Sequence, residues 1–228
     1  MSADDTQTSL KVITSGAFAA ALEELLEIYR ARHGRLIDLS FGSSLGAAHD
    51  SIPTRLANGE RFDVYFLARD ALDEFTAQGI IRERSSVDLV ESHIGAMVRS
   101  EDPAPDISTV DALKETLLSA KSIAHAACAS GIYLTHELFP ALGIVDEMKK
   151  TARTILSERV GTVVARGDAD LGFQQISEIL PIKGVKVVGR LPGAHERSFR
   201  FCMGIGAQTN NMEAARDLMR VIASEEAA

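Results

Sequence analysis

The sequence predicts an α/β fold made of two lobes, each with a mostly parallel sheet flanked by helices. Three strand–turn–helix units follow one another in the first eighty residues, and strands that alternate with helices at this spacing are typical of parallel sheets covered on both faces. A proline-broken loop, EDPAPD at 101–106, then separates a second set of strands and helices. A chain of 228 residues is long enough to bury one large core or two smaller ones.

The three units of the first lobe share a short apolar strand, a turn of small residues and an amphipathic helix. Their predicted strands cover residues 10–14, 36–41 and 62–67, and their helices end near 33–34, 56–58 and 79. The second helix is expected to open directly after Ser43 and Ser44, so that free N–H groups would lie beside both hydroxyls. Asp70 is the predicted N-cap of the third helix.

The second lobe is expected to begin after a strand at 92–99. Further strands are predicted at 122–126, 169–173 and 185–189, with helices at 110–118, 130–142 and 158–166. A strand at 200–206 and an amphipathic helix at 212–223 close the chain. The predicted lobes therefore cover residues 8–90 with 200–228, and residues 91–199.

The composition excludes several classes of function. The formal net charge of −8 comes from interspersed acids and bases without a basic stripe, which disfavours nucleic acids and membrane surfaces as partners. Cys128 and Cys202 lie far apart, without the spacing of a zinc site. They are expected to be two buried thiols, with one long-range disulfide as the alternative. The N-terminal residues have neither a basic nor an apolar leader region, so the chain as written is expected in the cytoplasm; if a leader was removed, it belongs to the periplasm.

The turn after the second strand is the first candidate site. Its unpaired amides and the positive end of a helix dipole suit a small anion. The turn also matches the GxSxG motif of serine hydrolases, with the sequence Gly42-Ser43-Ser44-Leu45-Gly46. However, no oxyanion-hole segment precedes it, and His195 has no evident acidic partner, so a serine hydrolase is disfavoured. A turn with two capping serines is the plainer interpretation.

Several titratable residues lie beside the predicted turns. His125 ends a strand just before ACASG, and His49 lies one turn past Ser44; a buried histidine and a surface histidine are the plainer interpretations. Surface salt bridges are the plainer interpretation of Arg69 and Arg159, but both open helices beside the proposed site turns, where a carboxylate ligand would need a cation. The sequence holds no metal-binding spacing, no GxxxxGK[ST] and no GxGxxG, so neither metal nor cofactor is predicted.

The order of the motifs resembles the type II periplasmic solute-binding proteins, most closely the molybdate-binding group. The residues that carry the resemblance span nearly the whole chain: VITSGAF at 12–18, SFGSSLG at 40–46, GERFDVYFLA at 59–68, ASGIYLTHELFPALGI at 129–144, ARGDADLGFQQ at 165–175 and VKVVGRLPG at 185–193. The resemblance implies two lobes joined by crossovers near 90–97 and 193–201, with a ligand held between them.

Carried over position by position, the resemblance implies a binding site made of turns from both lobes. Its members are Gly16, Ala17, Phe18, Ser43, Ser44, Ser130, Gly131, Ile132, Gln174 and Gln175. Two hydroxyl donors of the molybdate group are missing, because Ala17 and Gln175 stand in their places. An amide both donates and accepts hydrogen bonds, which suits a small organic acid better than molybdate.

The resulting hypothesis is a protein that captures a small oxyanion or organic carboxylate by hinge closure, with a transporter membrane component as a further partner if the protein is exported. The alternative is an isomerase of an unsaturated di- or tricarboxylate, similar to aconitate isomerase on the same fold. That reaction needs a base to move a proton, for which His125, His49 and Glu158 are candidates. Arg69 or Arg159 would hold a carboxylate.

Overall fold

The computed structural model describes residues 9–46, 49–156 and 158–224. The chain divides into two compact units: unit 1 comprises Met1–Val90 and Arg200–Ala228, and unit 2 comprises Glu91–Phe199. It enters unit 2 within β4 (Val87–Arg99) and returns within β9 (Ser198–Ile205). The polar N-terminal stretch and Ala47–Ala48, the latter inside the predicted second helix, lie outside the described residues.

Unit 1 is built on a sheet with the strand order β2-β1-β3-β9. The central β1 (Leu10–Thr14) runs parallel to β2 (Ile37–Phe41) and to β3 (Val64–Ala68), whereas β9 pairs with β3 in the antiparallel sense. Every residue of β3 is buried, as expected for a strand covered on both faces.

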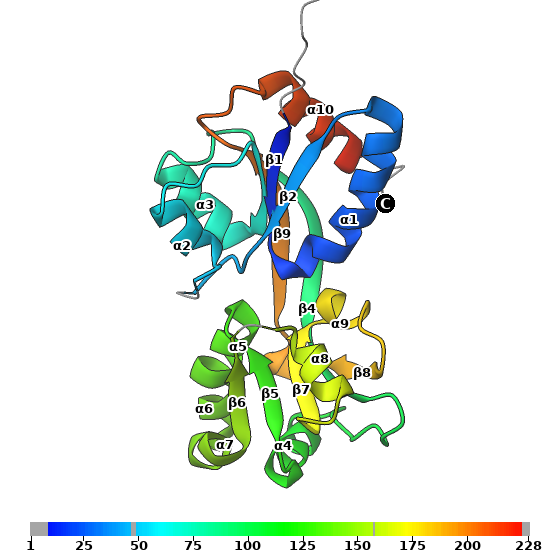
Figure 1. The fold of residues 1–228 in the computed structure, drawn as a ribbon. Helices are drawn as coiled ribbons and strands as arrows, with labels where there is room; N and C mark the ends of the chain where they lie inside the picture. The colour runs from blue at the N-terminus through cyan, green and yellow to red at the C-terminus, as the bar shows by residue number, and fades with distance from the viewer. Residues whose placement is uncertain (1–8, 47–48, 157, 225–228) are drawn as a thin grey trace, which may run out of the picture. The chain divides into compact units, whose positions relative to one another are not determined.

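Helices cover both faces of this sheet (Figure 1). On one face, α1 (Gly16–His33) and α10 (Met212–Ile222) bury an apolar core around Leu22, Leu26 and Leu218. On the other face, α2 (Ile52–Ala57) and α3 (Arg69–Ala77) form a second core. The sheet of unit 1 is therefore the middle layer of three.

Unit 2 repeats this plan with the strand order β8-β4-β7-β5-β6. β5 (Ile123–Ala126) runs parallel to β6 (Ala152–Ile155) and to β7 (Leu171–Gln175). β4 is antiparallel both to β7 and to β8 (Val185–Arg190). All three parallel strands thus point their carboxyl ends towards one edge of the sheet.

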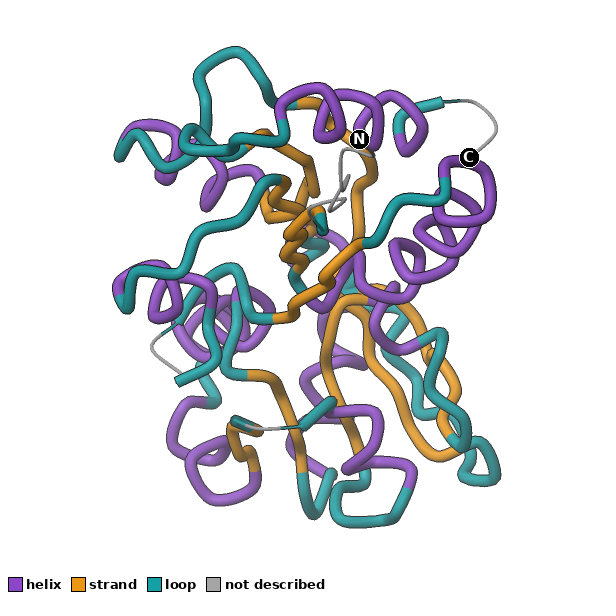
Figure 2. Tube along the Cα trace, turned by 45° about the horizontal axis from the view of Figure 1, so that its top comes forward, coloured by secondary structure: helices purple, strands orange, loops and turns teal. Residues whose placement is uncertain are grey.

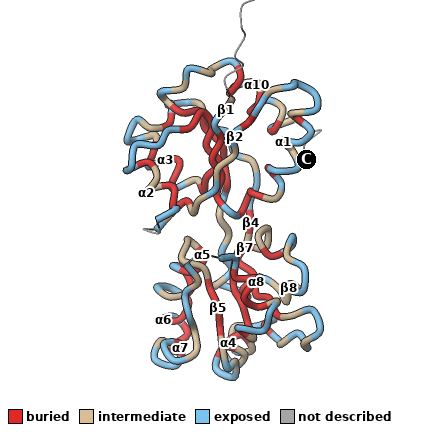
Figure 3. Tube along the Cα trace, viewed as in Figure 1, coloured by how far each residue is buried: buried red, intermediate tan, exposed pale blue. Residues whose placement is uncertain are grey.

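Helices again flank the sheet of unit 2, as the tube in Figure 2 also shows. One core lies under α4 (Val110–Ser119), the consecutive helical turns α5 (Ala129–Tyr133), η1 (Leu134–Leu138) and α6 (Phe139–Leu142), and α7 (Val145–Thr151). The opposite face packs against α8 (Val160–Ala165) and α9 (Ile176–Ile179). The short 3₁₀ turn Gly193–His195 precedes β9. In both units the buried residues follow the strands (Figure 3), and the predicted α/β class is confirmed.

The predicted helix after Ser44 is wrong, because α2 begins only at Ile52. Ser51 is its N-cap and Pro53 lies in its first turn, both strong start signals. The prediction of Asp70 as an N-cap is also wrong: Ala68 is the N-cap, and Asp70 lies in the first turn of α3, where its charge favours the helix dipole. Residues 145–155, which form α7 and β6, were not predicted as regular structure.

Replacing Leu22 tests the first core of unit 1. Leu22 is fully buried, so Leu22→Ala should lower the free energy of unfolding of this unit by about 2–5 kcal/mol through lost burial and an unfilled cavity. Leu36→Ala is the control, since Leu36 is 64% exposed and its loss should change the free energy by less than about 0.5 kcal/mol. Equal effects of the two variants in chemical denaturation would contradict this packing.

Candidate binding site

The site in unit 2 begins with the sheet. Because β6, β5 and β7 are parallel neighbours, the segments after their carboxyl ends meet at one edge, where open α/β sheets bind ligands. Those segments carry Ser130 after β5, Arg159 after β6 and Gln174–Glu178 from the end of β7 into α9. Four of the predicted site residues, Ser130, Arg159, Gln174 and Gln175, are therefore brought to the same edge.

Three polar atoms at this edge are buried without a hydrogen-bond partner: Oε1 of Gln174, Oε1 of Gln175 and Oε2 of Glu178. The three residues follow one another within five positions at the junction of β7 and α9. Leaving a buried polar atom unpaired costs about 1–3 kcal/mol. Three such atoms close together in the chain indicate a place where a polar ligand would bind and supply the missing hydrogen-bond partners.

Glu178 has the most altered acid–base behaviour of this group. Burial raises the pKa of its carboxyl to about 7, and hydrogen bonding by Gln174, the charge of Arg159 and the Gln175 N–H counter this only in part. Part of the side chain is exposed, although Oε2 is buried. A carboxyl with a pKa near neutrality can both take and return a proton under ordinary conditions.

Arg159 is the cation of this edge. It is the N-cap residue of α8 and is exposed, and its charge acts on the carboxyl of Glu178. Across the described residues, no salt bridge or hydrogen bond of its guanidinium is seen. A guanidinium without an acidic partner is suited to a bidentate contact with a carboxylate ligand.

The turn after β5 adds small donors. Ser130 is fully buried, and its hydroxyl lies 3.4 Å from the thiol sulfur of Cys128. Burial raises the pKa of the Cys128 thiol, so that it is neutral. Gly131 is required here, since a Cβ at this position would lie 1.7 Å from the carbonyl oxygen of Ala126 and 2.8 Å from Nδ1 of His125.

His125 is 4% exposed, and burial lowers its pKa. Its Nδ1 lies 3.4 Å from the carbonyl oxygen of Ala126. Ile132, which follows Gly131 in the turn after β5, is 45% exposed. His125 is thus a neutral, largely enclosed imidazole behind the turn.

Unit 1 has a corresponding edge at the carboxyl ends of β2, β1 and β3. The backbone N–H of Ser15 donates to the carbonyl of Phe66 at 3.0 Å, and that of Gly42 donates to the carbonyl of Thr14 at 3.1 Å. The hydroxyl of Ser44 accepts the N–H of Ala68 at 3.2 Å. These bonds join the ends of the three strands, so the plainer structural role applies to Ser44.

The start of α1 is the free part of this edge. Ser15 is the N-cap residue of this helix of 18 residues, yet it makes no side-chain cap bond, and its Oγ is buried without a partner. Ala17 and Phe18 are buried, and Phe18 stacks on Phe66 with 5.5 Å between ring centroids. The N–H of Phe18 donates to the carbonyl of Ser15 at 3.3 Å, so the N–H groups of Gly16 and Ala17 and the Ser15 hydroxyl remain as donors.

Other predicted residues are placed differently. Ser43 is half-buried, and its hydroxyl donates to the carbonyl of Leu45 at 2.7 Å. Arg69 is in salt bridges with Asp73 and Asp88, which occupy its guanidinium. His49 lies in an exposed turn. In the described residues after Ser44 the first helix is α2, which begins at Ile52, so they do not form the strand-to-helix elbow of a serine hydrolase.

Glu158 is exposed and accepts a bond of 2.7 Å from the guanidinium of Arg166. Hydrogen bonding by Arg166 lowers the pKa of this carboxyl. A carboxylate held in this way is a weaker base than one whose pKa is raised by burial.

Sequence reasoning missed Ser15, Cys128 and Glu178 as members of these edges. Glu178 could have been found by following the site turn into the next helix, since α9 (Ile176–Ile179) begins directly after Gln175. Its burial has no signal in the sequence. The predicted sharing of one cleft by the two edges concerns the arrangement of the two units and stays a prediction.

The described residues contain no cluster of three or more metal-binding side chains. Among them, no helix is both long and apolar enough to cross a membrane. The thiols of Cys128 and Cys202 are both free, and Cys202 is fully buried in a core of unit 1.

Two α/β units with polar groups at the carboxyl ends of parallel strands are the architecture of a solute-binding protein. The chain belongs to the family of bacterial extracellular solute-binding proteins, whose family model matches residues 10–228. The resemblance noted in the motifs is thereby confirmed.

The chain is similar to known proteins both in sequence and in structure. An aconitate isomerase from Pseudomonas sp. is 38% identical over 221 residues, which are 97% of this chain and 84% of that protein. The periplasmic molybdate-binding protein of Azotobacter vinelandii has a TM-score of 0.75 at 22% identity, covering 96% of this chain and 94% of the other. A sulfate-binding protein of Mycobacterium tuberculosis has a TM-score of 0.76 at 15% identity, covering 96% and 83%. At these identities the two structures show a common fold.

The titration of Glu178 can be tested without a ligand. Carboxyl ¹³C NMR should give a midpoint near pH 7 for Glu178, because burial disfavours its charged form. The pKa of Glu178 is higher in the folded state than in the unfolded state. As the pH rises, the unfolded state therefore loses this proton at a lower pH than the folded state does. The free energy of unfolding should therefore fall as the pH rises from about 4.5 to about 7, and the loss should remain above pH 7.

Glu178→Gln removes this titration. The free energy of unfolding of the variant, minus that of the wild type, should therefore be about 2–3 kcal/mol higher at pH 8 than at pH 4. Glu137→Gln is the matched control on an exposed glutamate of unit 2 and should leave the pH dependence unchanged. A midpoint near 4.5 for Glu178 would contradict its burial.

Proposed function

We propose that this protein binds a small unsaturated polycarboxylate of the aconitate type and moves its double bond. The observation that carries the proposal is the 38% identity with an aconitate isomerase over 97% of this chain. The side chains at the edge of unit 2 support it, since the amide NH₂ groups of Gln174 and Gln175 can donate to a carboxylate, and the guanidinium of Arg159 can bind one.

The side chains at this edge suit the parts of such a reaction. Arg159 would hold one carboxylate, because its guanidinium has no acidic partner among the described residues other than the nearby Glu178. The hydroxyl of Ser130 and the amide groups of Gln174 and Gln175 would orient the rest of the ligand. These three side chains are neutral, so the positive charge of Arg159 would offset part of the negative charge of the ligand.

Moving the double bond requires one group that accepts and then returns a proton. In its deprotonated form Glu178 would take a proton from the carbon next to the double bond, and the electron pair of the broken C–H bond would form the new double bond. The former double bond would then take the same proton at its far carbon. Glu178 ends as it began, and Arg159 would stabilise the charge that builds up on the carboxylate between the two steps.

A second candidate is binding without catalysis, which the description of the family favours. In that case the protein would act outside the cytoplasmic membrane and pass its anion to the membrane component of a transporter. The isomerase needs neither the partner nor that location.

Incubation with trans-aconitate, followed by chromatography for cis-aconitate, decides between the two candidates. The isomerase predicts interconversion in both directions by the wild-type protein. Glu178→Gln should lower kcat at least 100-fold, the usual contribution of a positioned base, and leave the affinity for trans-aconitate within about threefold. Absence of interconversion together with tight binding in calorimetry would support the second candidate.

Glu158→Gln, His125→Gln and His49→Gln give the comparison that the sequence alone left open. If loss of turnover follows one of these variants instead of Glu178→Gln, the proton-transfer role belongs to that residue. Activity that rises with pH through about 7 and then levels is the profile expected for a base with the pKa of Glu178.

Arg159→Gln tests how the carboxylate is held. The variant should weaken binding of trans-aconitate at least tenfold, because a charge-assisted contact is worth about 1.5–3 kcal/mol. Arg190→Gln is the matched control, since Arg190 is an exposed arginine of unit 2 that pairs with Glu196, and should change the affinity less than twofold. Unchanged binding by Arg159→Gln would remove this residue from the site.

A further inference from the structure

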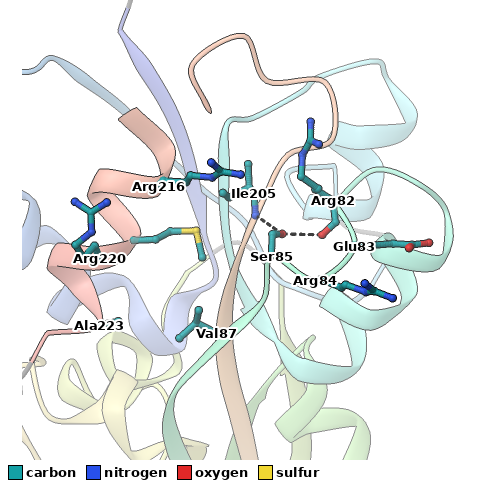
Figure 4. A pocket seen from close by; sticks show the side chains of 10 residues that line it. Arg82, Glu83, Arg84, Ser85, Val87, Ile205, Arg216, Arg220 and Ala223 are labelled. Atoms are coloured by element: carbon teal, nitrogen blue, oxygen red, sulfur yellow. Dashed lines mark hydrogen bonds between the residues drawn. The ribbon is translucent and has the colours of Figure 1, made fainter. Parts of the chain in front are cut away.

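A hollow lies in unit 1, away from the carboxyl ends of its parallel strands. It has a volume of about 370 Å³, within the range of small-molecule pockets. Its walls are the turn before β4, the last residue of β9 and the outer side of α10 (Figure 4). No residue of the candidate binding site lines it.

Four arginines surround the hollow, two from the turn and two from α10: Arg82, Arg84, Arg216 and Arg220. Glu83 is the one acidic residue among those that line it. In a chain with a formal net charge of −8, this is a local concentration of positive charge. This positive charge at a concave surface favours an anion. The Arg82 guanidinium also donates to the carbonyl of Ala207 at 3.4 Å, and the Arg84 side chain extends away from α10 (Figure 4).

The acids nearby do not neutralise these arginines fully. Asp217 on α10 contacts Arg220 through Oδ1 at 3.2 Å, but its Oδ2 lies 3.2 Å from both the Tyr29 hydroxyl and Nδ1 of His33. Arg216 and Arg220 are four residues apart on one helix, where like charges repel. In the described part of the chain no ion pair of Arg216 or Arg84 is seen.

The turn that carries Arg82 is fixed to the sheet. The Ser85 hydroxyl donates to the carbonyl of Arg82 at 2.7 Å and accepts the N–H of Ile205 at 3.0 Å. The N–H of Arg82 donates to the carbonyl of Ile205 at 2.8 Å. Figure 4 shows Arg216 extending from α10 towards Ile205, so a rigid turn and a helix present guanidinium groups from two sides.

The floor of the hollow is apolar. Val87 is 38% exposed, whereas Met219 and Ile205 are almost fully buried beneath it. A ligand would therefore place its charge against the arginines and an apolar body against these side chains. A phosphate dianion can accept two parallel N–H bonds from the fork of donors that a guanidinium offers.

We propose that the arginine-lined hollow between the turn at Arg82–Ser85 and α10 binds a small organic phosphate monoester, as a site separate from that for the polycarboxylate. The dianionic phosphate contacts Arg82 and Arg216, and the organic part lies on Val87 and Met219.

The probe for this site is phenyl phosphate. Calorimetry on the full chain should show one site, with inorganic phosphate bound at least fivefold more weakly because it lacks the apolar body. The double variant Arg82→Gln/Arg216→Gln should weaken binding of phenyl phosphate at least tenfold. The charge-matched control Arg153→Gln/Arg190→Gln alters two exposed arginines of unit 2 and should change the affinity less than twofold.

Methyl ¹³C NMR locates the binding. The Met219 signal, assigned from Met219→Leu, should shift on addition of phenyl phosphate, and saturation with trans-aconitate should leave that shift unchanged. Circular dichroism of each variant checks that its fold is retained. Equal loss of affinity in both double variants, no shift of Met219, or competition by trans-aconitate would overturn the proposal, whatever the outcome of the isomerase assay. Equal affinity for both phosphates would overturn the apolar contact.

Discussion

Parallel pairing of β5 with β6 and β7 is the constraint on which the candidate site depends. It sends three carboxyl ends to one edge and so gathers residues that are separated by up to about fifty positions in the chain. The turn after β5 can approach this edge closely only because Gly131 has no side chain to meet the carbonyl of Ala126. A shift in the register of these strands would move their polar side chains to other positions, and the site would be lost.

The polar atoms of this edge are costly to the folded protein. Unpaired amide oxygens on Gln174 and Gln175 and a carboxyl driven towards its neutral form all oppose stability. Proteins retain such features where they are needed for function. In unit 1, by contrast, the hydroxyl of Ser44 accepts a hydrogen bond from the N–H of Ala68. The backbone bonds described at that edge join one strand end to another.

Much of the fold could be predicted, because buried parallel strands such as 62–67 have an unmistakable apolar run and helices such as α10 a clear apolar stripe. The helix start after Ser44 was mispredicted since two serines resemble a cap, while Ser51 with Pro53 provides the stronger signal. β6 escaped prediction because it has four residues, two of them exposed. Within the site, turns could be read from the sequence, but the burial of Glu178 and the salt bridge of Arg69 with Asp88 arise from packing between segments that are further apart in the chain.

The discontinuity of unit 1 affects the order in which a chain emerging from the ribosome can fold. β3 acquires its antiparallel neighbour β9 only after the whole of unit 2 has been synthesised, whereas unit 2 is contiguous and can complete its own sheet first. Until then β3 presents an open, apolar edge of the kind that pairs with other chains. The nascent protein is therefore most vulnerable to aggregation through its N-terminal half, during the interval in which its last strand is still being made.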